Sequence, residues 1–427
     1  MAYPAAPGHA SSTSEACAGV VPGATTVEAR GQRRAEEEVE HQVTHHHERG
    51  SSLRTLSQLA LTGALLVALV LLAGCGGGTD DAPKTATAGA TQAATEPQTK
   101  PKEIVVRSWG DPWSTSLQEY AGKQFTADTG IKVKFDLSDF GEVQTKIQQA
   151  LASGRRPPVD VVHTVDRMAD KAMAAKLSVP LDVENIVTNY ADLTSAGKPE
   201  GTTNYVNIYS YTFPIIFRKG AVEPGKDFSW LDLLEPKYEN TFVMASTYEV
   251  ALYPIAKAMG IDPATDDLGP VWDTVKKLRK ASCGVGQDVE FIEFLKSKQC
   301  AWGAFIAGNA FALEDAGVKV DWMVPKEGVT LARDSLYVPR GLPEDVTYWA
   351  QKFVNYVIDA ETQTKLTAKT GTVPTNGKAE PRKDLIGDPA FPFTDAEIEQ
   401  YAIPMDTRLA ARNDDEWQSR YAAALQG

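Results

Sequence analysis

Histidine, cysteine and the common catalytic motifs are scarce in this 427-residue sequence. Five of its six histidines lie within the first 47 residues, which leaves His163 as the one histidine of the rest. The sequence has no Gly-x-Ser-x-Gly, His-Glu-x-x-His or P-loop motif. We therefore predict no enzyme activity, no metal site and no cofactor, although His163 could serve as a catalytic base or be a buried, hydrogen-bonded residue at a strand end.

The chain also lacks basic runs. It has 43 Lys and Arg against 56 Asp and Glu, a formal net charge of −13, which argues against nucleic acid or an anionic membrane surface as the main partner. A hydrophobic content of 43% is ordinary for a globular protein, and the length favours two lobes or domains.

We predict that the first 74 residues are a leader. We expect residues 1–50 to be disordered or untranslated rather than to bind metal through their histidines. Arg49 and Arg54 then precede an apolar stretch that ends in Leu72-Ala73-Gly74-Cys75, an ending that resembles the lipobox of bacterial lipoproteins. We predict export, cleavage before Cys75, lipidation of Cys75 as a membrane anchor, and a flexible tether over residues 75–102.

Two cysteines remain for the folded part of the chain. Cys17 lies in the leader and Cys75 is the predicted anchor, so Cys283 and Cys300 are left. In an exported protein they are candidates for a disulfide, and the alternative is two separate buried thiols.

From residue 103 onward, strands alternate with helices. Short apolar runs suited to buried strands occur at 104–106, 160–162, 242–244 and 301–305, an alternating strand pattern occurs at 131–135, and amphipathic helices lie between them. This order predicts an α/β fold with largely parallel sheets. Segments 208–213 and 331–338 are predicted to be extended and to cross from one lobe to the other. A turn is predicted at Gly284-Val285-Gly286.

Several weak motifs occur in a specific order along residues 103–427. They are Val106 to Trp109, Phe125 to Val133, Val159-Asp160-Val161-Val162, Ser229 to Leu234, Val324-Pro325-Lys326-Glu327-Gly328, Asp334 to Pro339, and Thr370 to Asn376. Together they resemble the spermidine/putrescine-binding family of ABC-transporter solute-binding proteins. The resemblance implies a two-lobed type II periplasmic-binding-protein fold with two crossing strands as hinge. Lobe 1 would comprise about 103–210 and 334–376, and lobe 2 about 213–331 with the C-terminal helices 377–427.

The resemblance also implies a function. The protein would be a monomeric, lipid-anchored component of an ABC importer at the cell surface or in the periplasm. It would close about its hinge on a small charged organic solute, polyamine-like by family, and deliver it to permease subunits in the membrane.

The candidate ligand-binding residues come from strand ends and from the resemblance. Trp109 and Asp111 follow the first strand, where ligands of open α/β sheets bind, and an indole face can hold an ammonium group. The resemblance implies an amine-binding carboxylate at Asp334, an aromatic residue at Tyr211, and one of an acidic pair at Glu249 or its neighbour Thr247. Asp111 could instead be a turn residue.

The departures from the family widen the choice of ligand. Two characteristic family tryptophans fall at Ala332 and Ile306, and a family tyrosine falls at Thr372 or Val373. Arg333 would offer a planar fork to a carboxylate or phosphonate, so an anionic or zwitterionic solute is the alternative to a polyamine. The alternative outside the binding proteins is a secreted lipoprotein enzyme that uses His163 as its catalytic base.

Overall fold

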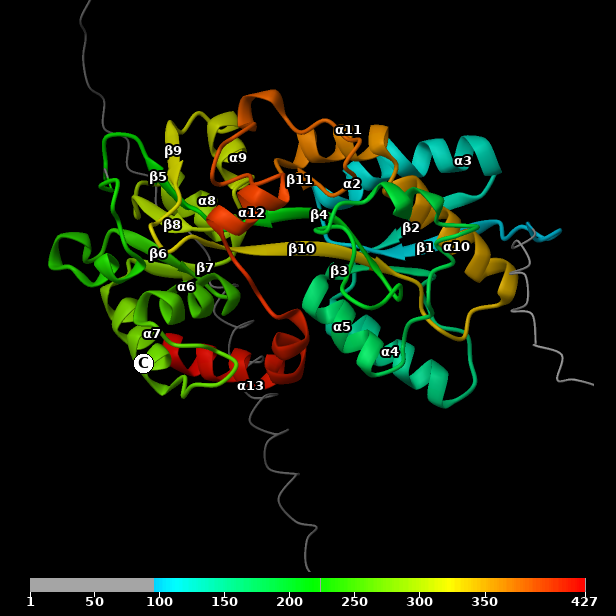
Figure 1. Cartoon of the computed structure of the whole chain (residues 1–427), viewed down its shortest axis with the longest axis horizontal. Coiled ribbons are helices and arrows are strands. Elements are labelled where there is room, and N and C mark those ends of the chain that lie inside the picture. Colours follow the sequence, from blue (N-terminus) through cyan, green and yellow to red (C-terminus); the bar gives the residue numbers. More distant parts are fainter. Residues whose placement is uncertain (1–95, 223, 427) are drawn as a thin grey trace, which may run out of the picture. The chain divides into compact units, whose positions relative to one another are not determined.

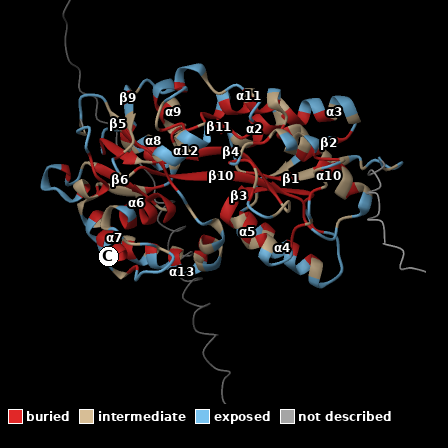
Figure 2. Cartoon of the chain, in the orientation of Figure 1, coloured by how far each residue is buried: buried red, intermediate tan, exposed pale blue. Residues whose placement is uncertain are grey.

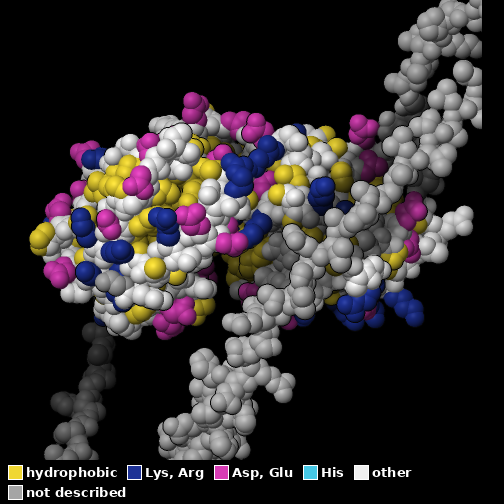
Figure 3. Space-filling model, turned by 90° about the horizontal axis from the view of Figure 1, so that it is seen from below, with side chains coloured by type: hydrophobic (Ala, Val, Ile, Leu, Met, Phe, Trp, Pro, Cys, Tyr) yellow, Lys and Arg dark blue, Asp and Glu magenta, His cyan; other side chains and the backbone are white. Residues whose placement is uncertain are grey.

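The computed structural model describes residues 96–222 and 224–426, all within one compact unit. The predictions on residues 1–74, on Cys75 and on most of the tether lie outside these residues. No helix within 96–222 and 224–426 combines the length and apolarity that crossing a bilayer requires. Charged side chains of both signs are scattered over the face shown in Figure 3.

A seven-stranded mixed sheet contains the strands predicted at 104–106, 131–135 and 160–162. Its order is β11-β4-β10-β3-β1-β2, and β12 pairs with β10; β1, next to the edge strand β2, is parallel to β2 and β3, whereas β10 is antiparallel to β3 and β4. The strands are β1 (Glu103–Arg107), β2 (Lys132–Asp136), β3 (Val161–Val165), β4 (Val206–Thr212), β10 (Val329–Tyr337), β11 (Val373–Pro374) and β12 (Ala402–Ile403). The helices that accompany these strands along the chain are α2 (Trp113–Leu117), α3 (Lys123–Thr129), α4 (Phe140–Ala152), α5 (Asp166–Ala174), α10 (Glu344–Val357) and α11 (Ala360–Thr370).

A five-stranded sheet of order β7-β6-β8-β5-β9 contains the strands predicted at 242–244 and 301–305. Its strands are β5 (Ile215–Arg218), β6 (Phe242–Ala245), β7 (Gly284–Gly286), β8 (Trp302–Ala304) and β9 (Val320–Met323). The helices are α6 (Glu249–Met259), α7 (Gly269–Ala281), α8 (Asp288–Lys296) and α9 (Asn309–Asp315), and the chain ends with α12 (Asp395–Tyr401) and α13 (Thr407–Gln426). A π-helical turn (Gln118–Gly122) joins α2 to α3, and short 3₁₀ segments lie at Thr188–Asp192, Trp230–Leu234, Pro236–Tyr238 and Lys383–Leu385.

The two predicted crossings are β4 and β10. They pair with each other along most of their length and lie side by side in Figure 1. β4 leads directly into β5 of the other sheet, and β10 follows β9 from that sheet. The start of β10 is also tied to α6, because the hydroxyl of Thr330 donates to the backbone carbonyl of Glu249 at 2.9 Å.

The inner strands of both sheets are buried, as Figure 2 shows, whereas the edge strands β2 and β9 are mostly half-buried or exposed. In the second sheet the core is aromatic: Trp302 is fully buried and stacks edge-on against Phe228 and Phe242. Its indole Nε1 donates to the hydroxyl of Thr241 at 2.8 Å, so the one polar atom of this side chain is satisfied.

The turn predicted at Gly284-Val285-Gly286 was wrong, because these residues form β7, parallel to β6. The glycines allow α8 to pack closely on this strand. A Cβ on Gly284 would lie 2.7 Å from the ring of Phe294, and one on Gly286 would lie 2.5 Å from Cβ of Glu290. Glycine, which usually marks turns, is used here for close approach of a helix.

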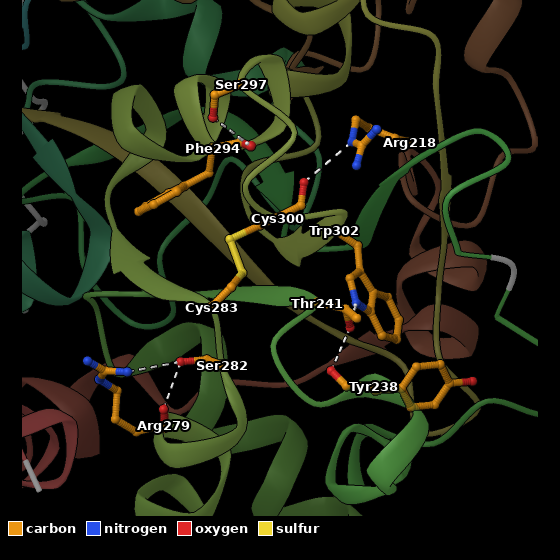
Figure 4. The surroundings of a disulfide bond; sticks show 10 residues. All are labelled: Arg218, Tyr238, Thr241, Arg279, Ser282, Cys283, Phe294, Ser297, Cys300 and Trp302. Carbon is orange, nitrogen blue, oxygen red and sulfur yellow. Dashed lines mark hydrogen bonds between the residues drawn. A yellow bond between two sulfur atoms is a disulfide. The ribbon is translucent and has the colours of Figure 1, made fainter.

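Cys283 and Cys300 form a disulfide, with their Cα atoms 6.0 Å apart (Figure 4). Cys283 comes directly before β7 and Cys300 lies two residues before β8, so the bridge joins the two strands that flank β6. Cys300 is 1% exposed, and its carbonyl accepts from Nε of Arg218 at 3.4 Å.

Candidate functional site

The carboxylate of Asp334, on β10, is the centre of a buried hydrogen-bond network. Its Oδ2 accepts from the indole Nε1 of Trp109 at 2.9 Å and from the hydroxyl of Tyr209 at 2.7 Å. The same oxygen lies 2.9 Å from Nε2 of His163, and Oδ1 accepts from the hydroxyl of Tyr211 at 2.9 Å. Asp334 is 3% exposed, so these donors replace the water that a carboxylate would otherwise bind.

Strand pairing brings these donors together. Tyr209 stands directly opposite Asp334 in the β4–β10 pair, and Tyr211, two residues further on, points to the same face of the sheet. His163 lies on the neighbouring strand β3. Trp109 follows the end of β1 by two residues, which is the strand end where the sequence predicted a ligand site.

Burial fixes the charge states around Asp334. It raises the pKa of Tyr209 and Tyr211 well above the usual value for tyrosine, and the negative charge of Asp334 raises both further. Both hydroxyls therefore stay protonated and can donate. Burial lowers the pKa of Arg107 to about 10, so this guanidinium stays charged at neutral pH, with its central carbon 3.9 Å from the ring centroid of Trp109.

Ser108, His163 and Asp334 form a chain that has the order of a catalytic triad. The hydroxyl of Ser108 lies 2.9 Å from Nδ1 of His163, and Nε2 of His163 lies 2.9 Å from Asp334. Ser108 and His163 are both fully buried, whereas a nucleophilic serine must present its hydroxyl to a substrate. Of the two roles that the sequence left open for His163, the structure favours the buried, hydrogen-bonded one.

Besides the network around Asp334, a cluster of charged side chains connects α5, α6 and α13. Arg167, the second residue of α5, donates through Nε and Nη2 to Oε1 of Glu249, the first residue of α6. Its Nη1 lies 3.0 Å from Oδ1 of Asp414 in α13. Beside it, Oδ2 of Asp166 lies 3.4 Å from Nη1 of Arg333 on β10.

The charges of this cluster depend on one another. Burial opposes the charge of Arg167, but the carboxylate of Glu249 and then that of Asp414 more than offset it, and the pKa of Arg167 lies above its usual value. Burial raises the pKa of Asp166 to about 6, although the charges of Arg333 and Arg167 act to lower it. Arg167 is therefore ionised at every physiological pH, and Asp166 titrates near the acidic end of that range.

The structure separates the predicted site residues into two groups. Trp109, Tyr211 and Asp334 lie in one hydrogen-bonded network, and Glu249 and Arg333 belong to the charged cluster. Arg333 and Asp334 are neighbours on β10, and successive residues of a strand point to opposite faces of its sheet. Their contacts differ accordingly, since Arg333 meets Asp166 and Asp334 meets the aromatic donors.

Asp111 and Thr247 are both exposed. Oδ1 of Asp111 accepts from the hydroxyl of Ser114 at 3.1 Å, which is the turn role that the sequence left open for this residue. Among the described residues, no side-chain hydrogen bond links Asp111 or Thr247 to Asp334 or to Glu249.

Tyr209 and Arg167 were not among the candidates predicted from the sequence. Tyr209 could have been found, because it lies two residues before Tyr211 and a strand repeats its face with that period. Arg167 carried no local signal, since its partner Asp414 lies 247 residues further along the chain. Within 96–222 and 224–426, no three His, Cys, Asp or Glu side chains are grouped so that they could hold a metal ion.

Comparison with known families gives a match over more than half of the chain. The model of the family described as bacterial extracellular solute-binding protein matches residues 121–393. Among curated proteins, the spermidine/putrescine-binding periplasmic protein of Escherichia coli strain K12 is 25% identical over 254 residues, 58% of this chain and 71% of its own. The spermidine/putrescine-binding periplasmic protein 1 of Haemophilus influenzae is 24% identical over 304 residues, 66% of this chain and 80% of its own.

Solved structures share the fold at low sequence identity. An ABC transporter substrate-binding protein from Bradyrhizobium japonicum matches with a TM-score of 0.65 and 18% identity, over 76% of this chain and all of its own. A spermidine/putrescine transporter substrate-binding protein from Streptococcus pneumoniae matches with a TM-score of 0.60 and 20% identity, over 75% of this chain and all of its own. A binding protein from A. tumefaciens B6, solved in complex with glucopine, has a TM-score of 0.60 and 16% identity over 76% and 99% of the two chains. The predicted fold class, a type II periplasmic binding protein, is confirmed.

Proposed function

Because the chain belongs to the bacterial extracellular solute-binding proteins, we propose that it is the capture component of an ABC importer for a small organic solute that carries an ammonium group. The observation that supports this proposal best is the buried carboxylate of Asp334 on a crossing strand, surrounded by aromatic donors. The lipid anchor at Cys75 and delivery to permease subunits belong to the same proposal.

Asp334 is arranged to receive a cation. Its Oδ2 has three partners, whereas Oδ1 accepts one hydrogen bond, from Tyr211, and a carboxylate oxygen can accept two. The indole of Trp109 and the hydroxyls of Tyr209 and Tyr211 are neutral, so these three donors orient the carboxylate without cancelling its charge, and the charged group that acts on it from nearby is Arg107. An ammonium group at Oδ1 would form a charge-assisted hydrogen bond, beside the half-buried indole of Trp109.

Capture follows from the position of this carboxylate at the hinge. Asp334 lies on β10 and Tyr211 on β4, the two strands that lead from one sheet to the other. A solute held here can also contact groups of the second sheet when the lobes close, and those added contacts would favour the closed form. The solute is released to the permease without chemical change.

Polyamines are the solutes to which the named relatives are assigned, and they are the first class to test. A second class, amino-carboxylates or aminophosphonates, is favoured by Arg333. Its Nε is buried and has no hydrogen-bond partner among the described residues, and its contact with Asp166 is long, at 3.4 Å. An oxygen of an anionic group would satisfy this donor.

Calorimetry with putrescine, spermidine, 4-aminobutyrate and 2-aminoethylphosphonate tests the proposal. We expect saturable heat with at least one of them and recovery of that compound unchanged. Absence of heat with both polyamines would exclude the first class, and absence of heat with all four would contradict the ammonium site. Turnover of a bound compound that is lost in His163→Ala would favour the enzyme alternative.

A further inference from the structure

Glu249 lies where the family resemblance puts an acidic residue of the second lobe. It begins α6 and is 8% exposed, and the resemblance would make its carboxylate a partner for a second ammonium group of a diamine. Thr247, the alternative residue that the resemblance implies for this acidic position, carries no charge. Of these two residues, only Glu249 could therefore offer a negative charge to a cation at this position.

That charge is already matched within the chain. Arg167 donates to Oε1 of Glu249 through two of its nitrogens, and a guanidinium is ionised at any physiological pH. The pair is buried, with side-chain exposures of 11% for Arg167 and 10% for Glu249, so solvent does not screen it as it screens a surface pair.

Arg167 also has the other surroundings that a bound organic cation requires. Its Nη1 lies 3.0 Å from the carboxylate of Asp414, and its guanidinium carbon lies 5.5 Å from the ring centroid of Tyr248. Two carboxylates and an aromatic ring thus enclose a cation that the protein itself supplies. Helix α5 follows a strand of the seven-stranded sheet, and α6 follows a strand of the five-stranded sheet. The guanidinium of Arg167 therefore connects the parts of the protein built on the two sheets, as a bound solute would.

We propose that Arg167 takes the place of the second cationic group of a diamine, so that the protein selects solutes with one ammonium group and discriminates against diamines and polyamines. This inference rests on the proposed function and narrows its solute class. A solute of this kind places its ammonium at Asp334, and its remaining part meets a second lobe whose acidic residue is neutralised. Putrescine would have to bring a second charge beside Arg167, which is unfavourable.

The test is calorimetry with putrescine on variants that free Glu249. In Arg167→Met the carboxylate loses its guanidinium partner, and we expect the affinity for putrescine to rise at least tenfold over the unaltered protein. Adding Glu249→Gln in the same chain should abolish this gain. Lys171→Met is the matched control, because Lys171 lies one turn further along α5 and contacts Asp415 at 2.7 Å and Asp414 at 3.5 Å without contacting Glu249, and it should produce no gain.

Among the described residues, loss of Arg167 also leaves Asp414 with only Tyr248 at 3.3 Å and Lys171 at 3.5 Å as partners, so the Arg167→Met/Asp414→Asn double variant is measured in parallel, with circular dichroism to check folding. If folded variants bind putrescine no better than the unaltered protein, Arg167 does not set specificity. If the unaltered protein binds putrescine tightly and Arg167→Met weakens it, the inference is overturned while the proposed function stands. If neither the unaltered protein nor any variant binds putrescine, spermidine, 4-aminobutyrate or 2-aminoethylphosphonate, both are overturned.

Discussion

Replacing Asp334 by alanine is expected to weaken solute binding at least tenfold, about 1.4 kcal/mol, and to lower the free energy of unfolding by about 2–4 kcal/mol. The change removes the one carboxylate shared by Trp109, Tyr209 and Tyr211, of which the two tyrosines are buried and Trp109 is half-buried. Each donor left without a partner costs free energy, and the solute loses its carboxylate. Calorimetry measures the first effect and urea denaturation the second.

A second substitution separates the two effects. Asp334→Asn keeps the shape of the side chain and one carbonyl oxygen, so it should lower stability less than alanine while still weakening binding at least tenfold through loss of charge. Asp273→Asn, at an exposed position of α7, is the control and should change neither quantity. An affinity that is unchanged in a folded Asp334→Asn variant would remove Asp334 from the site.

Removal of the disulfide is expected to have the other large effect. In the Cys283→Ala/Cys300→Ala variant we expect the free energy of unfolding to fall by about 3 kcal/mol, because the bridge closes a loop of 17 residues in the unfolded chain. The bridge joins the strands on either side of β6. The lower free energy of unfolding should be measured as a lower midpoint of urea denaturation. Mass spectrometry of the native protein that finds two free thiols would contradict the bridge itself.

The fold was predictable where local pattern and tertiary structure agree. The strands at 104–106, 160–162 and 242–244 and the crossings at 208–213 and 331–338 all occur within one to three residues of their predicted bounds. Hydrophobic runs define such strands because both of their faces are covered. The exception, Gly284 to Gly286, failed because close packing of α8, which a single sequence does not display, requires glycine in a strand.

The site was predictable only in part. Asp334, Tyr211 and Trp109 were found through a strand end and a family resemblance, and they do lie in one network. The ion pair of Arg167 with Glu249 was not predictable, because it joins residues 82 positions apart on two helices that follow different sheets. Residue type and spacing suggest which carboxylates could bind a ligand, but the contacts decide which of them are already paired.

Native mass spectrometry of the exported protein, purified gently from its own producing cells, tests the central claim most directly. We expect a non-covalent adduct of a small organic solute that carries an ammonium group and is recovered chemically unchanged when the protein is denatured. A protein that carries no adduct, gains none from an extract of those cells, and instead releases a chemically altered compound would contradict it.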